Sequence, residues 1–299
     1  MKVYLSEYIA PSALKRLKET CEVVDTFDQI EEIDGIITRR TQITQEIIEK
    51  ATHLKVICQH GVGLDYIDVK TAQKHDIPVL NVPGQSAESV AELAVCFIMA
   101  ISRKLKYVDQ GMQKGLFEAF GDSRLIGHEI YGQKLGLVGS GNIAKRVAEM
   151  MKAAFHCDIY CYNPRRSKEE LANLGLKKVE TLQALFHDMD IVSIHIPLTP
   201  DTENLISEEV FKNANPNLLL VNTARGSIVN EKALYKALTE GQIAAAASDV
   251  FDVEVPDKDY PLLHLDNFIS TLHVGGSTKE ALDRVSNKAL DNLFSILLK

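Results

Sequence analysis

The sequence predicts an α/β protein of two domains, each built on a parallel sheet, with the second domain inserted into the first. Three observations support this prediction. The chain has 299 residues, which is enough for two hydrophobic cores. Short β-rich runs alternate with helical patterns along it, as in successive βαβ units. A glycine turn within residues 135–144 joins a short apolar run to a helical pattern.

Composition narrows the class of protein before any motif is considered. The chain is 45% hydrophobic and 25% charged, and its net charge of −8 comes without any Lys/Arg run longer than two residues. Nucleic acid and anionic membranes are therefore poor partners. Five scattered cysteines without a Cys-x-x-Cys predict neither disulfides nor a metal site. The N-terminus begins a strand pattern instead of a signal peptide, and no apolar run could span a membrane, so we expect a cytoplasmic location.

The first part of the chain contains the alternation of a parallel sheet, followed by one long helical pattern. Strands are expected at residues 3–5, 23–24, 35–38, 56–58 and 78–81, and helices at 13–18 and 45–51. Residues 86–111 are apolar in the middle and free of proline, which predicts a single extended helix. A helix of that length could cross from one domain to the other.

The second alternation starts at residue 135. Strands are expected at residues 158–162, 191–195, 218–222, 245–250 and 268–271. Asn230 is a good N-cap for a helix over 231–239, and Gly241 a good terminator. A final helix over 279–298 should return to the N-terminal domain and close it. We therefore expect one domain from residues 1–98 with 275–299, and the inserted domain from 99–274.

The glycine turn has the chemistry of a phosphate site. Gly139 permits the turn, and Gly141 leaves room for a pyrophosphate to approach the backbone. The helix that begins at Asn142 offers free N–H groups and a positive dipole end to an anion. Similar turns occur in methyltransferases, so this stretch alone does not decide between dinucleotide binding and that alternative.

Further motifs make the class specific. They are Gly-Val-Gly-Leu-Asp at 61–65, Val-Ala-Glu at 90–92, Asn-Thr-Ala-Arg-Gly at 222–226, Asp-Val-Phe-Asp-Val-Glu at 249–254 and His-Val-Gly-Gly at 273–276. With the glycine turn, this set resembles the D-isomer-specific 2-hydroxyacid dehydrogenases over essentially the whole chain. The resemblance implies two Rossmann-like or flavodoxin-like domains, with the cofactor domain inserted into the substrate domain. It also implies hydride transfer between a nicotinamide and C2 of a small 2-oxo or 2-hydroxy acid, bound in the cleft between the domains.

The resemblance assigns three catalytic residues, and their chemistry fits the reaction. Arg225 follows an apolar strand and would hold the substrate carboxylate and polarise its carbonyl oxygen. His273 would give a proton to the developing alkoxide. Glu254 would orient the imidazole and favour its charged form.

The resemblance also implies binding residues. The backbone N–H groups of Val62 and Gly63 would form an anion nest for the substrate carboxylate. Tyr66, at the pocket mouth, replaces the asparagine usual in the family, and Leu272 replaces a common proline. Asp249 would hold the nicotinamide amide, and His195 is expected to line the cofactor site instead of acting as a catalyst. The expected cofactor contacts are Val90, Gly139, Gly141, Asn142, Ile143, His195, Pro197, Thr202, Thr223, Ala224, Asp249 and Gly275.

One departure concerns the choice of cofactor. An acid at the end of the strand at 158–162 would bind the ribose hydroxyls of NAD and repel a 2′-phosphate. This chain has Asn163, followed by Arg165 and Arg166. The loss of the acid and the gain of two guanidiniums suit a 2′-phosphate, so the sequence predicts a preference for NADP over NAD. The alternative is that both arginines are solvated surface residues and NAD is used.

Substrate and assembly stay less defined. Phosphoglycerate dehydrogenases tend to carry arginine where this chain has Gln59, and no regulatory domain is expected after Lys299. Glyoxylate, hydroxypyruvate or a branched 2-oxo acid is therefore favoured over phosphoglycerate, although Arg39 and Arg40 could reach a phosphate. A corepressor-like, nucleotide-sensing binding protein of the same fold is the alternative function.

The family is usually homodimeric, and two uses compete for the apolar middle of the helix predicted at 86–111. It could form the dimer interface, or it could pack within its own chain. The apolar residues concerned are Leu93, Val95, Phe97, Ile98 and Met99.

Overall fold

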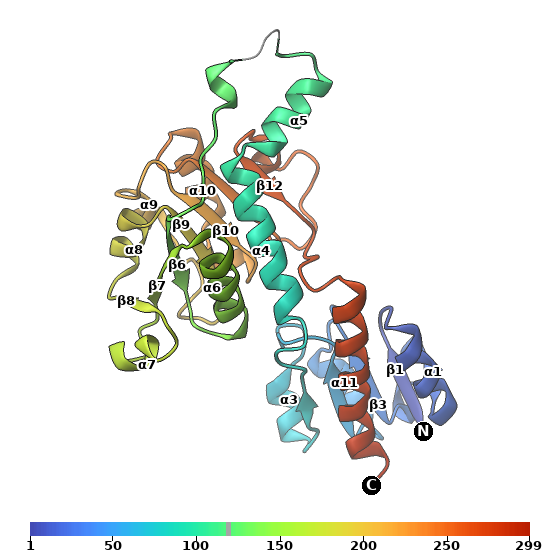
Figure 1. Ribbon diagram of the computed structural model, residues 1–299. Coiled ribbons are helices and arrows are strands. Elements are labelled where there is room, and N and C mark those ends of the chain that lie inside the picture. The colour runs from blue at the N-terminus through green and yellow to red at the C-terminus, as the bar shows by residue number, and fades with distance from the viewer. Residues whose placement is uncertain (118–120) are drawn as a thin grey trace. The chain divides into compact units, whose positions relative to one another are not determined.

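The computed structural model describes residues 1–117 and 121–299, and its contacts divide the chain into two compact units (Figure 1). The first unit is Met1–Ser86 with Gly276–Lys299, and the second is Ala87–Gly275. The second unit is thus inserted into the first. The first boundary falls earlier than the residue 98 expected from the sequence, because the buried side of helix α4 (Ala87–Ser102) belongs to a core of the second unit.

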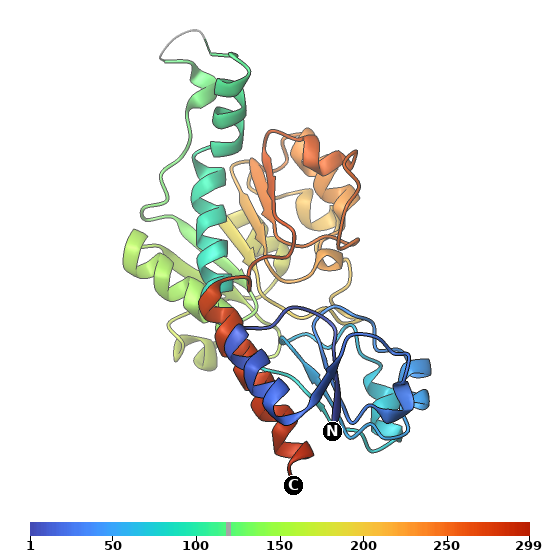
Figure 2. The same cartoon turned by 90° about the vertical axis from the view of Figure 1, so that its right-hand side faces the viewer.

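The first unit is a five-stranded parallel sheet in the order β2-β1-β3-β4-β5, the flavodoxin-like order. Helices α1 and α11 lie side by side on one face (Figure 2), where Leu17 and Leu293 pack on Val3 and Val56. The last helix, which the sequence predicts to return to the N-terminal domain, packs on the sheet of this unit. The elements are β1 (Lys2–Leu5), α1 (Pro11–Thr20), β2 (Glu22–Val24), η1 (Ile30–Glu32), β3 (Gly35–Thr38), α2 (Gln45–Lys50), β4 (Val56–Gln59), α3 (Val69–Lys74), β5 (Val79–Leu80) and α11 (Lys279–Leu297).

A buried polar link joins the sheet of the first unit to its helices. His60, at the end of β4, shares a hydrogen bond of 2.8 Å between Nε2 and Ser286 Oγ of α11. The same hydroxyl accepts a hydrogen bond from Ala10 N. Burial lowers the pKa of His60 to about 4, so the imidazole is neutral near pH 7.

The second unit is a seven-stranded parallel sheet in the order β12-β11-β10-β9-β6-β7-β8. From β6 the chain adds strands on one side of the sheet, through β7 to β8, and then on the other side, from β9 to β12. The position between β6 and β9 is the switch point where open α/β sheets bind ligands. This order confirms the Rossmann-like prediction. The strands are β6 (Lys134–Val138), β7 (Asp158–Tyr162), β8 (Lys177–Val179), β9 (Ile191–Ile194), β10 (Leu219–Asn222), β11 (Ala245–Ser248) and β12 (Phe268–Ser270).

Helices cover both faces of this sheet, and a separate apolar core lies on each face. Asn230 caps α10 through a hydrogen bond accepted from Ala233 N, as the sequence predicts. The helices besides α4 are α5 (Leu105–Gln113), η2 (Ser123–Leu125), α6 (Asn142–Phe155), α7 (Lys168–Ala172), α8 (Leu182–Asp188), α9 (Glu208–Phe211), η3 (Gly226–Ile228), α10 (Glu231–Thr239) and η4 (Pro261–His264). Among the described residues, no helix is long and apolar enough to cross a membrane.

The prediction of one helix over residues 86–111 is wrong. Helix α4 ends at Ser102, and α5 starts after Lys104, whose φ of 53° is left-handed. Lys106 explains the new direction, because its ammonium donates to the carbonyls of Leu263, Leu265 and Phe268 at 2.8–2.9 Å. Long-range hydrogen bonds therefore override a helical pattern that is locally continuous.

Candidate active site and cofactor site

The glycine turn lies at the carboxyl end of β6, beside β9. Gly139 has a φ of +100°, and a Cβ there would lie 2.7 Å from the carbonyl oxygen of His195. Gly141 is the N-cap of α6, and no atom lies within 4 Å of the position that its Cβ would take. The first glycine is required by the fold itself, whereas the second leaves open space before the helix N-terminus.

A cavity of about 390 Å³ adjoins this turn, at the carboxyl ends of β6, β7 and β9. It brings together seven of the residues expected to bind the cofactor, whereas Arg166 is not among its lining residues. Those seven are Gly139, Gly141, Asn163, Arg165, His195, Pro197 and Thr202. Ser140, Pro164 and Ile196, which belong to the predicted turn and loops, line the same cavity. Sequence reasoning missed the further lining residues Val138, Tyr162, Thr199, Asp201 and Leu205.

Asn163 links the glycine turn to the loop that follows β7. Its Nδ2 donates to Ser140 Oγ at 2.9 Å, and its Oδ1 accepts from Arg165 N at 3.0 Å. Within the described chain, neither Arg165 nor Arg166 forms an ion pair. The cavity wall therefore carries a neutral amide and an exposed guanidinium where a carboxylate would select NAD.

His195 lines the cavity as a neutral side chain. Its Nε2 shares a hydrogen bond of 2.9 Å with Ser193 Oγ, and burial lowers its pKa to about 3. A group with that pKa is not a proton donor near neutral pH. This agrees with the expectation that His195 is a wall of the site.

Arg225 follows β10 on a loop held by Asn222. The Asn222 side chain accepts from Ala224 N at 3.0 Å and donates to the Arg225 carbonyl at 2.9 Å. A Cβ on Gly226 would overlap the backbone of Phe251 and the next residue. The Arg225 loop therefore packs directly on the loop that leads to Glu254.

His273 and Glu254 form the predicted pair. The His273 Nδ1 lies 3.2 Å and 3.4 Å from the two Glu254 carboxylate oxygens. The side chains are 28% and 39% exposed, so the pair is within reach of a substrate. A carboxylate at this distance fixes the orientation of the ring.

Asp249 holds the loop that carries His273. Its carboxylate, on a residue that is 2% exposed, accepts hydrogen bonds from Thr271 Oγ1, Val274 N and Gly275 N. Its carbonyl oxygen accepts from His273 N at 2.7 Å. This network supports a left-handed backbone at His273, whose φ is 50°. The sequence pointed to a cofactor contact at Asp249, and it carried no signal for these bonds.

The remaining cofactor candidates of the second unit lie in three places. Val90 of α4 packs near Gly275, since a Cβ on that glycine would lie 3.3 Å from Val90 Cγ2. Thr223 is buried, and no hydrogen-bond partner for its Oγ1 is found among the described residues. Asn142 and Ile143 form the start of α6, and Ala224 lies in the loop after β10.

The predicted substrate residues Val62, Gly63 and Tyr66 belong to the first unit and follow β4. The carbonyl of Gly61 accepts from Val82 N at 2.9 Å, and that of Val62 accepts from Asn81 Nδ2 at 2.7 Å. No backbone acceptor for the N–H of Val62 or Gly63 occurs within the described ranges. The loop is thus held by its carbonyls, which suits an anion nest.

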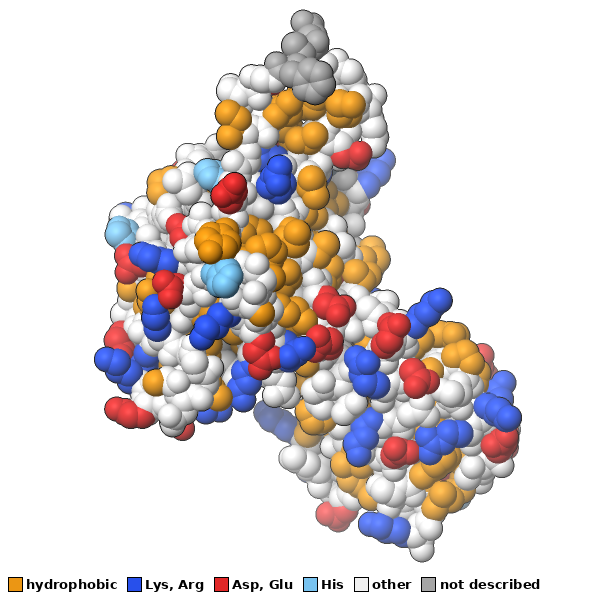
Figure 3. All heavy atoms as spheres, in the orientation of Figure 1, with side chains coloured by type: hydrophobic (Ala, Val, Ile, Leu, Met, Phe, Trp, Pro, Cys, Tyr) orange, Lys and Arg blue, Asp and Glu red, His pale blue; other side chains and the backbone are white. Residues whose placement is uncertain are grey.

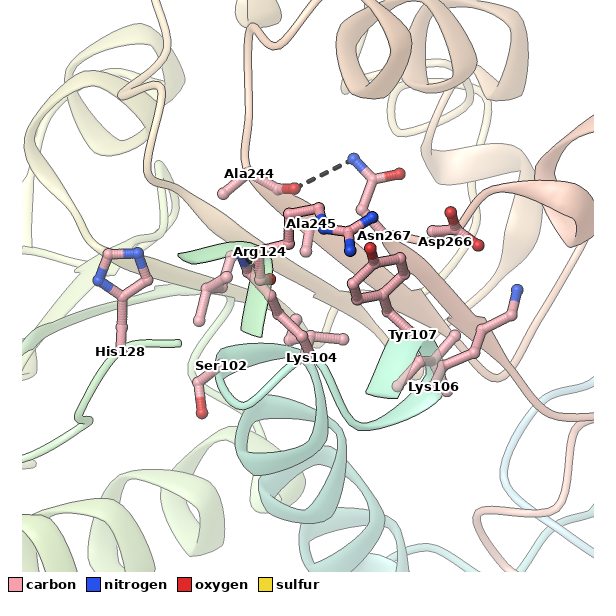
Figure 4. Close-up of a pocket in the computed structure, with 13 residues that line it drawn as sticks. Ser102, Lys104, Lys106, Tyr107, Arg124, His128, Ala244, Ala245, Asp266 and Asn267 are labelled. Carbon is pink, nitrogen blue, oxygen red and sulfur yellow. Dashed lines mark hydrogen bonds between the residues drawn. The ribbon is translucent and has the colours of Figure 1, made fainter. Parts of the chain in front are cut away.

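A second cavity, of about 430 Å³, lies at the opposite edge of the seven-stranded sheet (Figure 4). Its walls come from the α4–α5 junction and from the starts of β10, β11 and β12. Asn267 closes one wall by donating to the Ala244 carbonyl at 3.1 Å (Figure 4). None of the predicted site residues lines it. In the described part of the chain, no cluster of His, Cys, Asp and Glu could hold a metal ion.

Comparison with known proteins gives the class. Residues 95–275 match the family model of the D-isomer-specific 2-hydroxyacid dehydrogenase NAD-binding domain. The chain therefore belongs to the D-isomer-specific 2-hydroxyacid dehydrogenases, oxidoreductases that act on CH–OH donors with a nicotinamide cofactor.

Two curated relatives are similar in sequence. The chain is 39% identical over 290 residues to D-3-phosphoglycerate dehydrogenase of Methanocaldococcus jannaschii, covering 94% of this chain and 54% of that protein. It is 39% identical over 271 residues to hydroxypyruvate reductase of Thermotoga maritima, covering 90% of this chain and 86% of that one. The chain thus spans about half the length of the phosphoglycerate dehydrogenase.

Solved structures agree in fold. The TT0316 protein of Thermus thermophilus aligns with a TM-score of 0.92 and 31% identity, covering 100% of this chain and 97% of that one. An acyclic imino acid reductase with NADPH and D-Arg aligns at 0.87 with 28% identity, covering 99% and 96%. D-lactate dehydrogenase of Aquifex aeolicus with NAD and lactic acid aligns at 0.85 with 28% identity, covering 99% and 95%.

The two glycines of the turn should respond differently to alanine. Gly139→Ala places a Cβ against a backbone carbonyl at positive φ and should lower the free energy of unfolding by about 2 kcal/mol or more. Gly141→Ala meets no atom and should change it by less than about 1 kcal/mol, while weakening NADPH binding. Denaturant unfolding and fluorescence titration measure the two effects. Equal unfolding losses, or unchanged NADPH affinity in Gly141→Ala, would contradict this division.

Proposed function

We propose that this protein is a D-2-hydroxyacid dehydrogenase that works mainly as a 2-oxoacid reductase. The observation that carries the proposal is the His273–Glu254 pair, built into the same unit as Arg225 and the cavity at the glycine turn. The nicotinamide cofactor, when bound, supplies the hydride for C2 of the substrate. The glycine turn, the α6 N-terminus and the apolar cavity walls fit a dinucleotide.

The chain's own residues have separate tasks in this reaction. Arg225 holds the substrate carboxylate and polarises the carbonyl oxygen. The His273 imidazolium gives its proton to the oxygen as the alcohol forms, and Glu254 keeps the ring oriented and stabilises its charge. Val62 and Gly63 bind the substrate carboxylate through backbone N–H groups.

NADP is the proposed cofactor, with NAD as the alternative. Arg165 lines the cavity without an ion pair among the described residues, and Asn163 is a neutral amide held by Ser140. Both features favour a 2′-phosphate. Similar structures contain either NADPH or NAD, so relatives do not decide the choice.

The proposed substrate is glyoxylate, hydroxypyruvate or a branched 2-oxo acid. Gln59 supports this over phosphoglycerate, because the residue is 4% exposed and its side-chain amide donates to the Arg39 carbonyl at 2.9 Å. A buried neutral amide cannot replace a phosphate-binding arginine. Phosphoglycerate dehydrogenase remains the second candidate, since relatives carry that name and Arg39 is nearby.

Turnover tests the reaction class. NADPH and NADH oxidation should be followed with glyoxylate, hydroxypyruvate, pyruvate, branched 2-oxo acids and phosphohydroxypyruvate. His273→Ala should lower kcat at least about 100-fold because the proton donor is lost. Its NADPH affinity should stay unchanged. Nucleotide binding without turnover of any 2-oxo acid would contradict the proposal and favour a nucleotide-sensing binding protein.

Cofactor choice is tested by Asn163→Asp. The carboxylate should repel a 2′-phosphate, so the ratio of kcat/KM with NADPH to that with NADH should fall about tenfold or more. The fold should survive, because an aspartate can still accept from Arg165 N. It can also accept from the Ser140 hydroxyl, to which Asn163 now donates. Lys168→Ala, on the exposed side of α7, is the matched control and should leave the ratio unchanged. A wild-type ratio that favours NADH would refute the preference for NADP.

We also propose a cytoplasmic homodimer. All five cysteines are free thiols, which supports a reducing compartment. Phe97 and Ile98 are buried in their own unit, so they are not available to a partner. Exposed apolar side chains gather instead from the end of α4 through α5 and beyond (Figure 3). They are Met99, Leu105, Met112, Leu116 and Ile126.

Substitutions that place charged residues on this surface test the proposed dimer. Met112 and Ile126 are 69% and 68% exposed, so aspartate at either position should not disturb the fold. Light scattering after size exclusion should give twice the 33.2 kDa chain mass for the wild type and one chain mass for Met112→Asp/Ile126→Asp. Tyr8→Asp, at an exposed site of the first unit, should remain dimeric. A wild-type monomer, or a dimeric double variant, would contradict the proposed interface.

A further inference from the structure

The segment that carries Glu254 has little regular structure of its own. Residues 249–260 run from β11 to η4 without a helix or strand. The neighbours of Glu254 face solvent, since Val253 and Val255 are 63% and 67% exposed. Contacts made elsewhere along this loop therefore help to place Glu254 against His273.

One carboxylate from another element holds this loop at both ends. Glu231 is the first residue of α10. Its Oε1 accepts from Asp252 N at 3.1 Å, just before Glu254, and its Oε2 accepts from the Tyr260 hydroxyl, just before η4. Two donors from one loop thus converge on a single side chain.

The loop residues next to Glu231 are firmly packed. Phe251 is 8% exposed, and its ring lies edge-on to Tyr260 at 5.9 Å and to Phe268 at 6.2 Å between ring centres. Gly226 contacts the same backbone from the Arg225 loop. Burial raises the pKa of Glu231, and the hydrogen bonds from Tyr260 and Asp252 oppose that rise. A carboxylate so placed is costly unless its donors satisfy it.

We propose that Glu231 is a positioning residue, which holds Glu254 against His273 by joining Asp252 to Tyr260. Glu231 acts through the loop, because its hydrogen bonds go to Asp252 and Tyr260. The inference rests on the proposed function, since it assumes that the His273–Glu254 pair moves the proton. Helix α10 thereby contributes to the geometry of proton transfer.

The test compares Glu231→Ala with Glu231→Gln. The alanine removes both acceptors, whereas the glutamine can still accept from Asp252 N and donate to the Tyr260 oxygen. Glu231→Ala should lower kcat for 2-oxo acid reduction about tenfold, with little change in NADPH affinity. The limb of the pH profile assigned to His273 should move to lower pH, and Glu231→Gln should restore much of both effects. Glu240→Ala, at the other end of α10, is the matched control.

Two measurements separate this inference from simple loss of stability and from failure of the proposed function. The His273 pKa, followed by NMR in the full chain, should fall in Glu231→Ala as it does in Glu254→Gln, whether or not any 2-oxo acid is turned over. The double variant Glu231→Ala/Glu254→Gln should be no slower than Glu254→Gln alone. An unchanged His273 pKa in a folded Glu231→Ala protein, or additive effects in the double variant, would overturn the proposal. Tyr260→Phe provides a milder test if the alanine variant unfolds.

Discussion

The buried carboxylate of Asp249 is the interaction on which the geometry of the candidate active site depends. Taking an ionised group out of water is unfavourable unless several donors replace the lost solvation. Three donors from the loop after β12 do so, and the Asp249 carbonyl binds His273 N as well. The left-handed backbone at His273 can persist because these bonds over-determine it. The loop that aims the imidazole is thus tied to the end of β11.

The candidate site residues of the second unit lie in loops at the carboxyl ends of the strands of one sheet. Arg225, Asp249 and His273 follow β10, β11 and β12, and the glycine turn follows β6. Because all these strands are parallel, their carboxyl ends meet at the same edge, and the loops there can contact one another. The close approach of Gly226 to Phe251 and the bonds of Glu231 to the loop bearing Glu254 are examples. The rigid sheet therefore supports loops that lack regular structure.

Polar residues near the site divide into those that hold structure and those left to meet ligands. Loops of the chain itself are held by side-chain hydrogen bonds of Asn163, Asn222 and Glu231. Arg165 and the Val62 and Gly63 amides have no such use among the described residues. Arg165 and these two amides therefore keep their hydrogen-bonding capacity for ligands.

Local sequence determined much of the architecture: the strand, turn and helix around Gly139, and the cap of α10 at Asn230. The candidate catalytic residues came from the family resemblance of ordered motifs. It did not reveal the break between α4 and α5, because that depends on Lys106 meeting carbonyls far along the chain. Nor did it reveal β8, a short edge strand with two lysines that exists by pairing with β7. The bonds of Asp249 and Glu231 were equally invisible. Periodicity and turn chemistry act over a few residues, whereas the pairing of donors and acceptors between loops is decided only when the order of strands brings those loops together.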